Sequence, residues 1–464
     1  MTAAPAIPHV TIAATRSAAP APSRQIPLEP FQRLMLAWEE AHPYNAAHLV
    51  KLAGPANVPA LHAAITRVLA QSGIGRLHVN KKANRLHFDA GRQPLICVAR
   101  ADHDIDQEAL GELAESMNLR FSDAPHDPFR WLLIDESNGR WHVLVLVYHH
   151  VVSDGRGIQS LLTEILERYI GAKPLDSRPA LSFRDPAAAD PKRRRIGLIG
   201  FVRAYLRAVR LHLRILASYR MPEATDRGYE TGVTALRAPP TWVQEITRTC
   251  AARGVGFNDA CLAALACALA RITREQRARR LLGRRIALGT IMSTQHDDGS
   301  VPAGLGVHLG GLIIIVRNPD AHIDDVLTQV SRETHRLKTN RDAAQRVSVI
   351  LAFFARRVLP FLGVPNSRET YRFIFPICAG VSTLFVGNAS ENETMRGVRR
   401  YIRVSPPGPA MPIVLSPTIL EDGLELSLTY RLSCLKPREA AAVLESVMHA
   451  LCDLSSGRPA YGHL

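Results

Sequence analysis

The spacing of hydrophobic residues along the chain changes abruptly near residue 150. Residues 141–148 (WHVLVLVY) are almost all apolar or aromatic, which predicts a β-strand covered on both faces. The residues that follow predict an amphipathic helix over 157–170, with an apolar face made of Ile158, Leu161, Leu162, Ile165, Leu166 and Tyr169. Two histidines, an aspartate and a glycine stand at the junction of these predicted elements.

Similar patterns divide the chain into four parts. Residues 1–26 are rich in alanine and proline and predict a disordered arm. Strand and helix patterns then alternate through 27–184, with helices beginning near Pro30 and at Val58, which predicts an α/β half. Residues 185–235 are interpreted as a linker that contains a basic amphipathic helix, and 236–464 as a second half. A chain of 464 residues exceeds what one core normally serves, so two domains are expected.

The predicted helix in the linker combines a long apolar run with regularly spaced arginines. Arg203, Arg207, Arg210 and Arg214 recur every three or four residues and form one stripe opposite a broad apolar face. This pattern is typical of a helix that lies on an anionic membrane. It is also compatible with a crossover helix packed on the protein body with a solvated basic face. The arginines interrupt the apolar run too early for a transmembrane span.

The net charge of +15 is compatible with an acidic partner or with no partner. Nucleic acid is disfavoured because the basic residues lie between aliphatic residues rather than among stacking aromatics. An anionic bilayer, the phosphates of coenzyme A and an acidic carrier protein all remain compatible with this charge. Two further basic clusters, 271–285 and 396–403, are interpreted either as docking sites for the donor or as solvated faces.

The cysteines and the N-terminus predict a cytoplasmic protein. The 7 cysteines show neither CxxC pairing nor metal-ligand spacing, so we expect reduced core residues and no metal site. The first 24 residues lack the continuous apolar core of a secretory signal. We therefore expect a cytoplasmic monomer, with peripheral contact at the inner face of the membrane if the basic helix binds lipid.

The histidines at the strand end suggest acid–base chemistry. Successive strand side chains point to opposite faces, so His149 and His150 should occupy different environments. Imidazole, with an unperturbed pKa of about 6.5, can accept and return a proton near neutrality. Asp154 can bind loop amides or a cationic partner, and Gly155 permits a turn. The alternative is a structural histidine pair in a turn.

Residues 149–155 (HHVVSDG) resemble the HHxxxDG signature of the thioester-dependent acyltransferase superfamily, which includes chloramphenicol acetyltransferase, condensation domains and wax ester synthases. Residues 255–265 (VGFNDACLAAL) resemble the helix start that opens the second half of such proteins, with Asn258 or Asp259 as the expected N-cap. Residues 380–388 and 424–430 resemble further strands of the family. The arginine that the wax ester branch carries is missing from 288–295, so the partner of Asp154 is left open.

The resemblance implies an α/β fold of two chloramphenicol acetyltransferase-like subdomains, a pseudo-dimer with a tunnel between them. It implies transfer of an acyl group from coenzyme A or a carrier protein to an alcohol or amine, with no bound cofactor. His150 is the expected base, His149 supports it, and Asp154 and Gly155 shape the loop. Ser382 and Asn388 are candidates for the oxyanion site or the tunnel. The alternative is a noncatalytic module that binds a carrier protein or a membrane.

Overall fold

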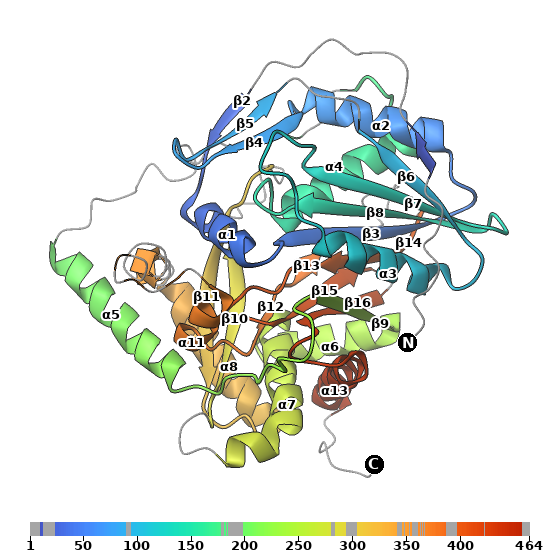
Figure 1. The fold of residues 1–464 in the computed structure, drawn as a ribbon. Helices are drawn as coiled ribbons and strands as arrows, with labels where there is room; N and C mark the ends of the chain where they lie inside the picture. The colour runs from blue at the N-terminus through green and yellow to red at the C-terminus, as the bar shows by residue number, and fades with distance from the viewer. Residues whose placement is uncertain are drawn as a thin grey trace.

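The computed structural model describes residues 10–12, 24–89, 94–177, 181, 183, 198–279, 284–293, 304–340, 346–347, 349–351, 353–354, 361, 363, 365, 367–386, 397–421 and 423–456. Two sheet-based halves lie against each other, the N-terminal half mainly in blue to teal and the C-terminal half mainly in green to red (Figure 1). The predicted α/β class with two subdomains is confirmed.

The N-terminal half is built on a six-stranded sheet in the order β1-β6-β7-β8-β3-β14, in which only β6 and β7 are parallel. A three-stranded sheet, β2-β5-β4, lies beside it. The strands are β1 (Val10–Ile12), β2 (Arg24–Pro27), β3 (Asn45–Ala53), β4 (Arg76–Asn80), β5 (Arg85–Asp89), β6 (Ile96–Ala101), β7 (Phe129–Glu136), β8 (Trp141–His149) and β14 (Val398–Val404).

Helices cover both faces of the six-stranded sheet, as the near-continuous apolar sequence of β8 predicts. On one face, α2 and α4 pack against Val50, Leu144 and Leu146. On the other, α3 packs against Leu49 and Val145. The helices of this half are α1 (Pro30–Ala41), α2 (Val58–Gln71), α3 (Ile105–Asn118) and α4 (Gly155–Tyr169).

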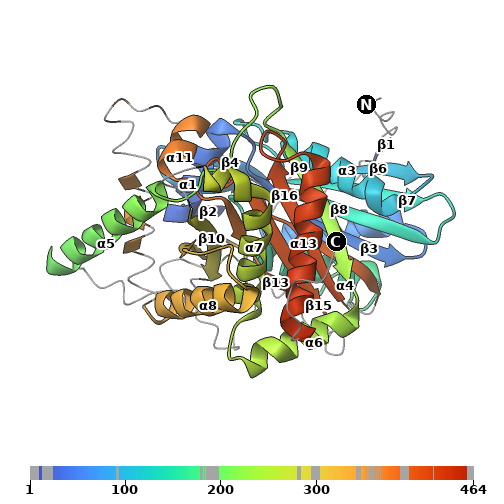
Figure 2. The same ribbon diagram turned by 90° about the horizontal axis from the view of Figure 1, so that it is seen from below.

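The C-terminal half is built on a second sheet in the order β11-β10-β12-β15-β16-β9, with β13 also paired to β15. Figure 2 shows α7 and α13 running across one face of this sheet, where their apolar sides form its core. The elements are α5 (Leu198–Leu216), β9 (Thr231–Ala238), α6 (Pro240–Ala252), α7 (Phe257–Ala278), β10 (Ile286–Ser293), β11 (Leu309–Val316), α8 (Ile323–Thr339), α11 (Arg368–Ile374), β12 (Ala379–Val381), β13 (Leu384–Phe385), β15 (Ile413–Leu420), β16 (Gly423–Arg431) and α13 (Pro437–Ser456).

The halves exchange structure, so the predicted boundaries need correction. β14 comes from the C-terminal half but pairs with β3 in the N-terminal sheet (Figure 1). β9 begins at Thr231, inside the predicted linker 185–235, because it pairs with β16 over its whole length. Within the predicted disordered arm 1–26, residues 10–12 and 24–26 lie in strands β1 and β2. Edge pairing with β6 and β5 orders these segments, and Ile26 is buried in the core.

The helix predicted from residues 255–265 is present as α7, but its N-cap differs from the prediction. The N-cap is Gly256, which provides no side-chain cap. Asn258 instead donates to the Thr290 hydroxyl at 3.2 Å and accepts from Thr383 at 3.0 Å. The polar side chain at the start of α7 therefore ties the helix to the neighbouring strands instead of capping it.

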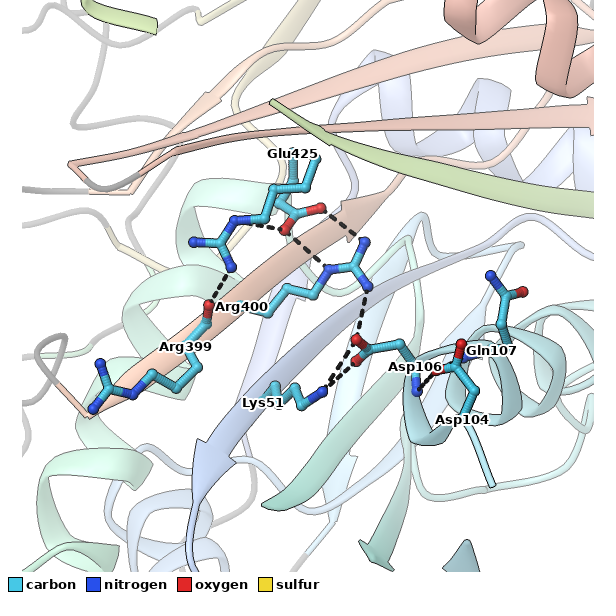
Figure 3. Close-up of polar contacts among 8 residues, drawn as sticks. Lys51, Asp104, Asp106, Gln107, Arg399, Arg400 and Glu425 are labelled. Carbon is cyan, nitrogen blue, oxygen red and sulfur yellow. Dashed lines mark hydrogen bonds and ion pairs between the residues drawn. The ribbon is translucent and has the colours of Figure 1, made fainter. Parts of the chain in front are cut away.

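An ion-pair network joins β14 to both halves (Figure 3). Arg400 on β14 forms a bidentate contact with Glu425 of β16 at 2.9 and 3.0 Å and lies 3.3 Å from Asp106 of α3. Lys51 of β3 binds Asp106 at 3.1 Å. Burial raises the pKa of Glu425, although the adjacent Arg400 opposes the shift. A buried carboxylate held by a forked guanidinium fixes the crossover strand in place.

Among the described residues, no single helix combines the length and apolar character needed to span a bilayer, although α6 and α7, which meet at a bend of 104°, reach that threshold together.

Candidate active site

His149 and His150 lie at the end of β8 and occupy different environments, as the strand geometry predicts. The Nε2 atom of His149 lies 2.7 Å from Glu39 of α1, and its Nδ1 atom lies 3.3 Å from His126. The ring stacks on Phe121 with 5.4 Å between centroids. Burial alone would raise the pKa of Glu39, but the hydrogen bond and charge of His149 outweigh it and leave that pKa below its usual value. These contacts anchor α1 to the strand end.

The imidazole of His150 has a fixed tautomer. Its Nδ1 atom lies 3.1 Å from the carbonyl oxygen of Ser153, three residues along the chain. Because a carbonyl oxygen only accepts, Nδ1 carries the proton and the Nε2 lone pair remains available. Among the described residues, Nε2 has no hydrogen-bond partner. The ring is stacked on Tyr44, with centroids 5.7 Å apart, and meets Tyr148 edge-on at 5.6 Å.

Burial keeps His150 neutral. The residue is 3% exposed, and burial together with the positive charge of Arg403 lowers its pKa to about 4, against the opposing effect of the Ser153 hydrogen bond. An imidazole with this pKa is unprotonated at neutral pH. His150 therefore presents a proton acceptor, not a cation, to whatever lies beside Nε2.

Asp154 holds the loop through backbone amides, one of the two kinds of partner that the sequence left open. One carboxylate oxygen caps α4 by accepting from Gly157 N at 3.0 Å, and the other accepts from His308 N at 3.1 Å. The backbone amide of Asp154 donates to Gly306 O at 3.0 Å. Residues 304–308 of the C-terminal half thus clamp the histidine loop.

An arginine does lie beside the loop, but it comes from β14. Arg403 is 4% exposed, and its Nη1 atom donates to both the carbonyl oxygen and the hydroxyl of Ser382 at 2.8 Å. Its side chain crosses Gly155, where a Cβ atom would lie only 2.4 Å from Arg403 Nε. Gly155 is therefore needed for close approach between the two halves. The interpretation of cluster 396–403 as docking or solvated residues is wrong for Arg403, because its guanidinium is buried.

Buried polar atoms surround Arg403. The unpartnered ones among the described residues include His48 Nε2, Tyr148 Oη, His308 Nε2 and Arg403 Nε. The charge of Arg403 also acts on His48, lowering a pKa that burial already depresses. Buried polar groups are normally hydrogen-bonded, so these atoms leave the polar cluster around Arg403 incompletely satisfied.

The structure brings together His149, His150, Asp154, Gly155 and Ser382 from the predicted set. Ser382 reaches the loop through Arg403, whereas Asn388 lies outside the described residues. Glu39, Tyr44 and Arg403 complete the site, and no local pattern in the sequence marks them. No group of three or more His, Cys, Asp or Glu side chains within the described part of the chain could hold a metal ion.

The fold and the histidine loop together define a class: a chloramphenicol acetyltransferase-like protein of two α/β subdomains with its candidate site where they meet. Comparison with known families then identifies the chain. The condensation domain family matches residues 23–280, more than half of the 464 residues, so the chain belongs to the condensation domain family.

Individual relatives are distant. One curated relative is a probable non-canonical nonribosomal peptide synthetase, CymA, from Salinispora arenicola (strain CNS-205). It is 29% identical over 147 residues, which are 31% of this chain and 2% of CymA. The first condensation domain of the CDA synthetase superposes with a TM-score of 0.68 and 16% identity, covering 94% of this chain and 97% of that one. The epimerization domain from the third module of tyrocidine synthetase B superposes with a TM-score of 0.63 and 13% identity. The superposition covers 96% of this chain and 99% of that one. These likenesses establish the fold.

Proposed function

We propose that the chain transfers an acyl group from a thioester, carried on the pantetheine arm of a carrier protein, to a hydroxyl or amine. Membership of the condensation domain family supports a carrier-bound donor, and the net charge of +15 suits an acidic carrier surface. Acyl-coenzyme A has the same thioester and is the alternative donor. An experiment must distinguish it from the carrier-bound donor.

The geometry of His150 is the observation that carries this proposal. Its Nδ1 proton is committed to the Ser153 carbonyl, its pKa is about 4, and Nε2 is left as an acceptor. A neutral imidazole fixed by its second nitrogen is the arrangement that general-base catalysis requires. His142 is also held by a backbone carbonyl at Nδ1, at 2.8 Å, but its Nε2 atom is bound to the Tyr169 hydroxyl at 3.1 Å, so it lacks the free acceptor that His150 presents.

The reaction follows from these groups. Nε2 of His150 takes the proton of the acceptor O–H or N–H as that atom attacks the thioester carbonyl. A new C–O or C–N bond forms, and the tetrahedral intermediate carries an oxyanion. When it collapses, the C–S bond breaks and the leaving thiolate takes the proton back from the imidazolium. Because the oxyanion is negative, its formation favours the protonated imidazole despite the low resting pKa.

Ser382 is the described residue best suited to stabilise the oxyanion. Its hydroxyl oxygen accepts from Arg403 at 2.8 Å, so its own proton is free to donate elsewhere. The guanidinium of Arg403 also adds a fixed buried positive charge next to this hydroxyl. A preorganised donor of this kind contributes most where water is excluded.

Mass spectrometry of product formation tests the proposed function. The purified protein is incubated with a panel of acyl thioesters on carrier protein and on coenzyme A, together with alcohol and amine acceptors. We expect acylated acceptor from the carrier-bound donor, and loss of that product with His150→Gln but not with His103→Gln, an exposed histidine away from the site. Equal product from His150→Gln would contradict the assignment of the base, and faster use of coenzyme A would contradict that of the donor.

A further inference from the structure

Helix α5 packs on the protein through a narrow stripe of its surface. The residues that face the body are spaced by four, three and four positions: Ala204, which is buried, and Ala208, Leu211 and Ile215, which join core clusters. Of these, Ala208 belongs to a cluster with Tyr371 and Phe375. His212, beside this stripe, packs its ring against Phe354 and Phe375. Figures 1 and 2 show the helix as a whole lying at the edge of the molecule.

A second stripe on α5 consists of large apolar side chains that are exposed. Their spacing of four, three, four and three residues places them on one face of the helix, and their exposed fractions range from 37% to 59%: Val202, Leu206, Val209, Leu213 and Leu216. Ile199 is 70% exposed and Phe201 and Tyr205 are each 51% exposed on the same helix. A contiguous apolar face of this kind marks an interaction surface.

A third stripe adjoins the exposed apolar face. Arg203, Arg207, Arg210 and Arg214 follow the same helical spacing, and none forms an ion pair with a described residue. The helix contains no Asp or Glu. Helical geometry therefore orders the stripes around α5 as packed, apolar exposed and basic.

This arrangement favours one of the two interpretations of the basic helix. A crossover helix with a solvated basic face would bury its large apolar residues and expose its arginines and small residues. In α5 the packed stripe instead contains two alanines, and most of the large side chains point outward. The smallest residues of α5 therefore pack on the protein, while most of its large apolar side chains remain exposed.

We propose that α5 binds in the plane of an anionic lipid bilayer, with the apolar stripe at the acyl boundary and the arginine stripe on the lipid phosphates. A bilayer interface presents an apolar layer directly beside a negatively charged layer along any length of helix, which matches the two adjoining stripes over the roughly 28 Å of a 19-residue helix. The positive net charge adds long-range attraction. This inference does not depend on the proposed reaction.

Vesicle flotation tests the proposal with the full-length protein. We expect binding to vesicles of phosphatidylcholine and phosphatidylglycerol and much weaker binding to phosphatidylcholine alone. Leu206→Gln with Leu213→Gln should reduce binding at least about tenfold, because two inserted apolar side chains are lost. Replacing Arg203, Arg207, Arg210 and Arg214 with Gln should reduce it at least about a hundredfold. All six side chains are outside the packed stripe, so circular dichroism should show an unchanged fold.

A matched control separates the site from the total charge. Arg248, Arg271, Arg274 and Arg279 are exposed on α6, α7 and the residue after α7, and their replacement with Gln removes the same charge elsewhere. Binding of this variant should fall by no more than about threefold. An equal loss in both quadruple variants would overturn the proposal.

Two further outcomes would assign α5 to another partner and also overturn it. One is unchanged vesicle binding together with loss of acyl transfer from carrier-bound donor in the arginine variant, which would identify a carrier-docking surface. The other is a dimer in solution that Leu206→Gln with Leu213→Gln dissociates, without vesicle binding by the parent protein. Absence of acyl transfer in the parent, with vesicle binding intact, would bear only on the proposed reaction.

Discussion

Replacing Gly155 with alanine tests whether Arg403 lies fixed across the start of α4. The alanine Cβ would lie 2.4 Å from Arg403 Nε, 2.9 Å from Cζ and 3.1 Å from Cδ. Gly155 has no left-handed backbone conformation, so the substitution introduces no backbone strain. The whole effect should therefore come from the contact with a buried guanidinium whose far end is held by Ser382.

The folded protein can accommodate the added methyl group in two ways. The one that costs less free energy sets the expected loss of stability. Local shifts that accommodate an extra methyl group in a packed region cost about 1 to 3 kcal/mol. Displacing Arg403 would break two hydrogen bonds to Ser382, each worth about 1.5 to 3 kcal/mol because the donor is charged. We expect Gly155→Ala to reduce the free energy of unfolding by about 1 to 3 kcal/mol.

Urea unfolding of four proteins measures this effect: the parent, Gly155→Ala, Arg403→Ala and the double variant. With Arg403 shortened, Gly155→Ala should change the free energy of unfolding by no more than about 0.5 kcal/mol. Gly111→Ala serves as the control, because a Cβ there meets nothing within 4 Å inside α3 and should stabilise by about 0.5 to 1 kcal/mol. An equal loss from Gly155→Ala with and without Arg403 would refute the reasoning.

Three other predictions concern charge and hydrogen bonding. Because the pKa of His150 is about 4 in the folded protein and about 6.5 when unfolded, this residue contributes stability that is fully present above pH 6.5 and lost as the pH falls towards 4. The acid limb of kcat/KM should correspondingly lie near pH 4; a limb near 6.5 in a pH–rate profile would contradict the burial argument. Ser382→Ala should lower kcat about 10- to 1,000-fold in single-turnover assays while leaving donor binding unchanged, and a change confined to KM would exclude an oxyanion role. Arg400→Met should destabilise by about 3 kcal/mol, because the buried Glu425 loses its bidentate partner and keeps only the 3.8 Å contact with Arg237. Adding Glu425→Met should recover part of that loss, and denaturant curves with additive losses would show that Arg400 and Glu425 are not coupled.

Local sequence pattern predicted the elements that carry the histidines. Strand β8 and helix α4 follow from the spacing of their own apolar residues, and the hydrogen bond that fixes His150 reaches only three residues along the chain. The different environments of the two histidines follow from strand alternation alone.

The partners of the motif could not be predicted in the same way, because they are distant in sequence. Glu39 lies 110 residues before His149, and His308 lies 154 residues after Asp154. Arg403 belongs to an arginine-rich stretch whose composition resembles a solvated surface. Its burial depends on the crossover of β14 into the other sheet, which only the assembled fold reveals. Helix α5 shows the same limit: the sequence located its arginine stripe but could not show which apolar side chains pack.

The central claim is that Nε2 of His150 is the base, and single-turnover transfer by His150→Ala tests it most directly. With enzyme in excess over the acyl carrier protein and with saturating acceptor, we predict a fall in rate of about 100- to 10,000-fold and partial recovery on addition of imidazole, which can enter the space left by the side chain. Substrate binding should stay near that of the parent. A His150→Ala protein that transfers the acyl group at the parent rate would contradict the account.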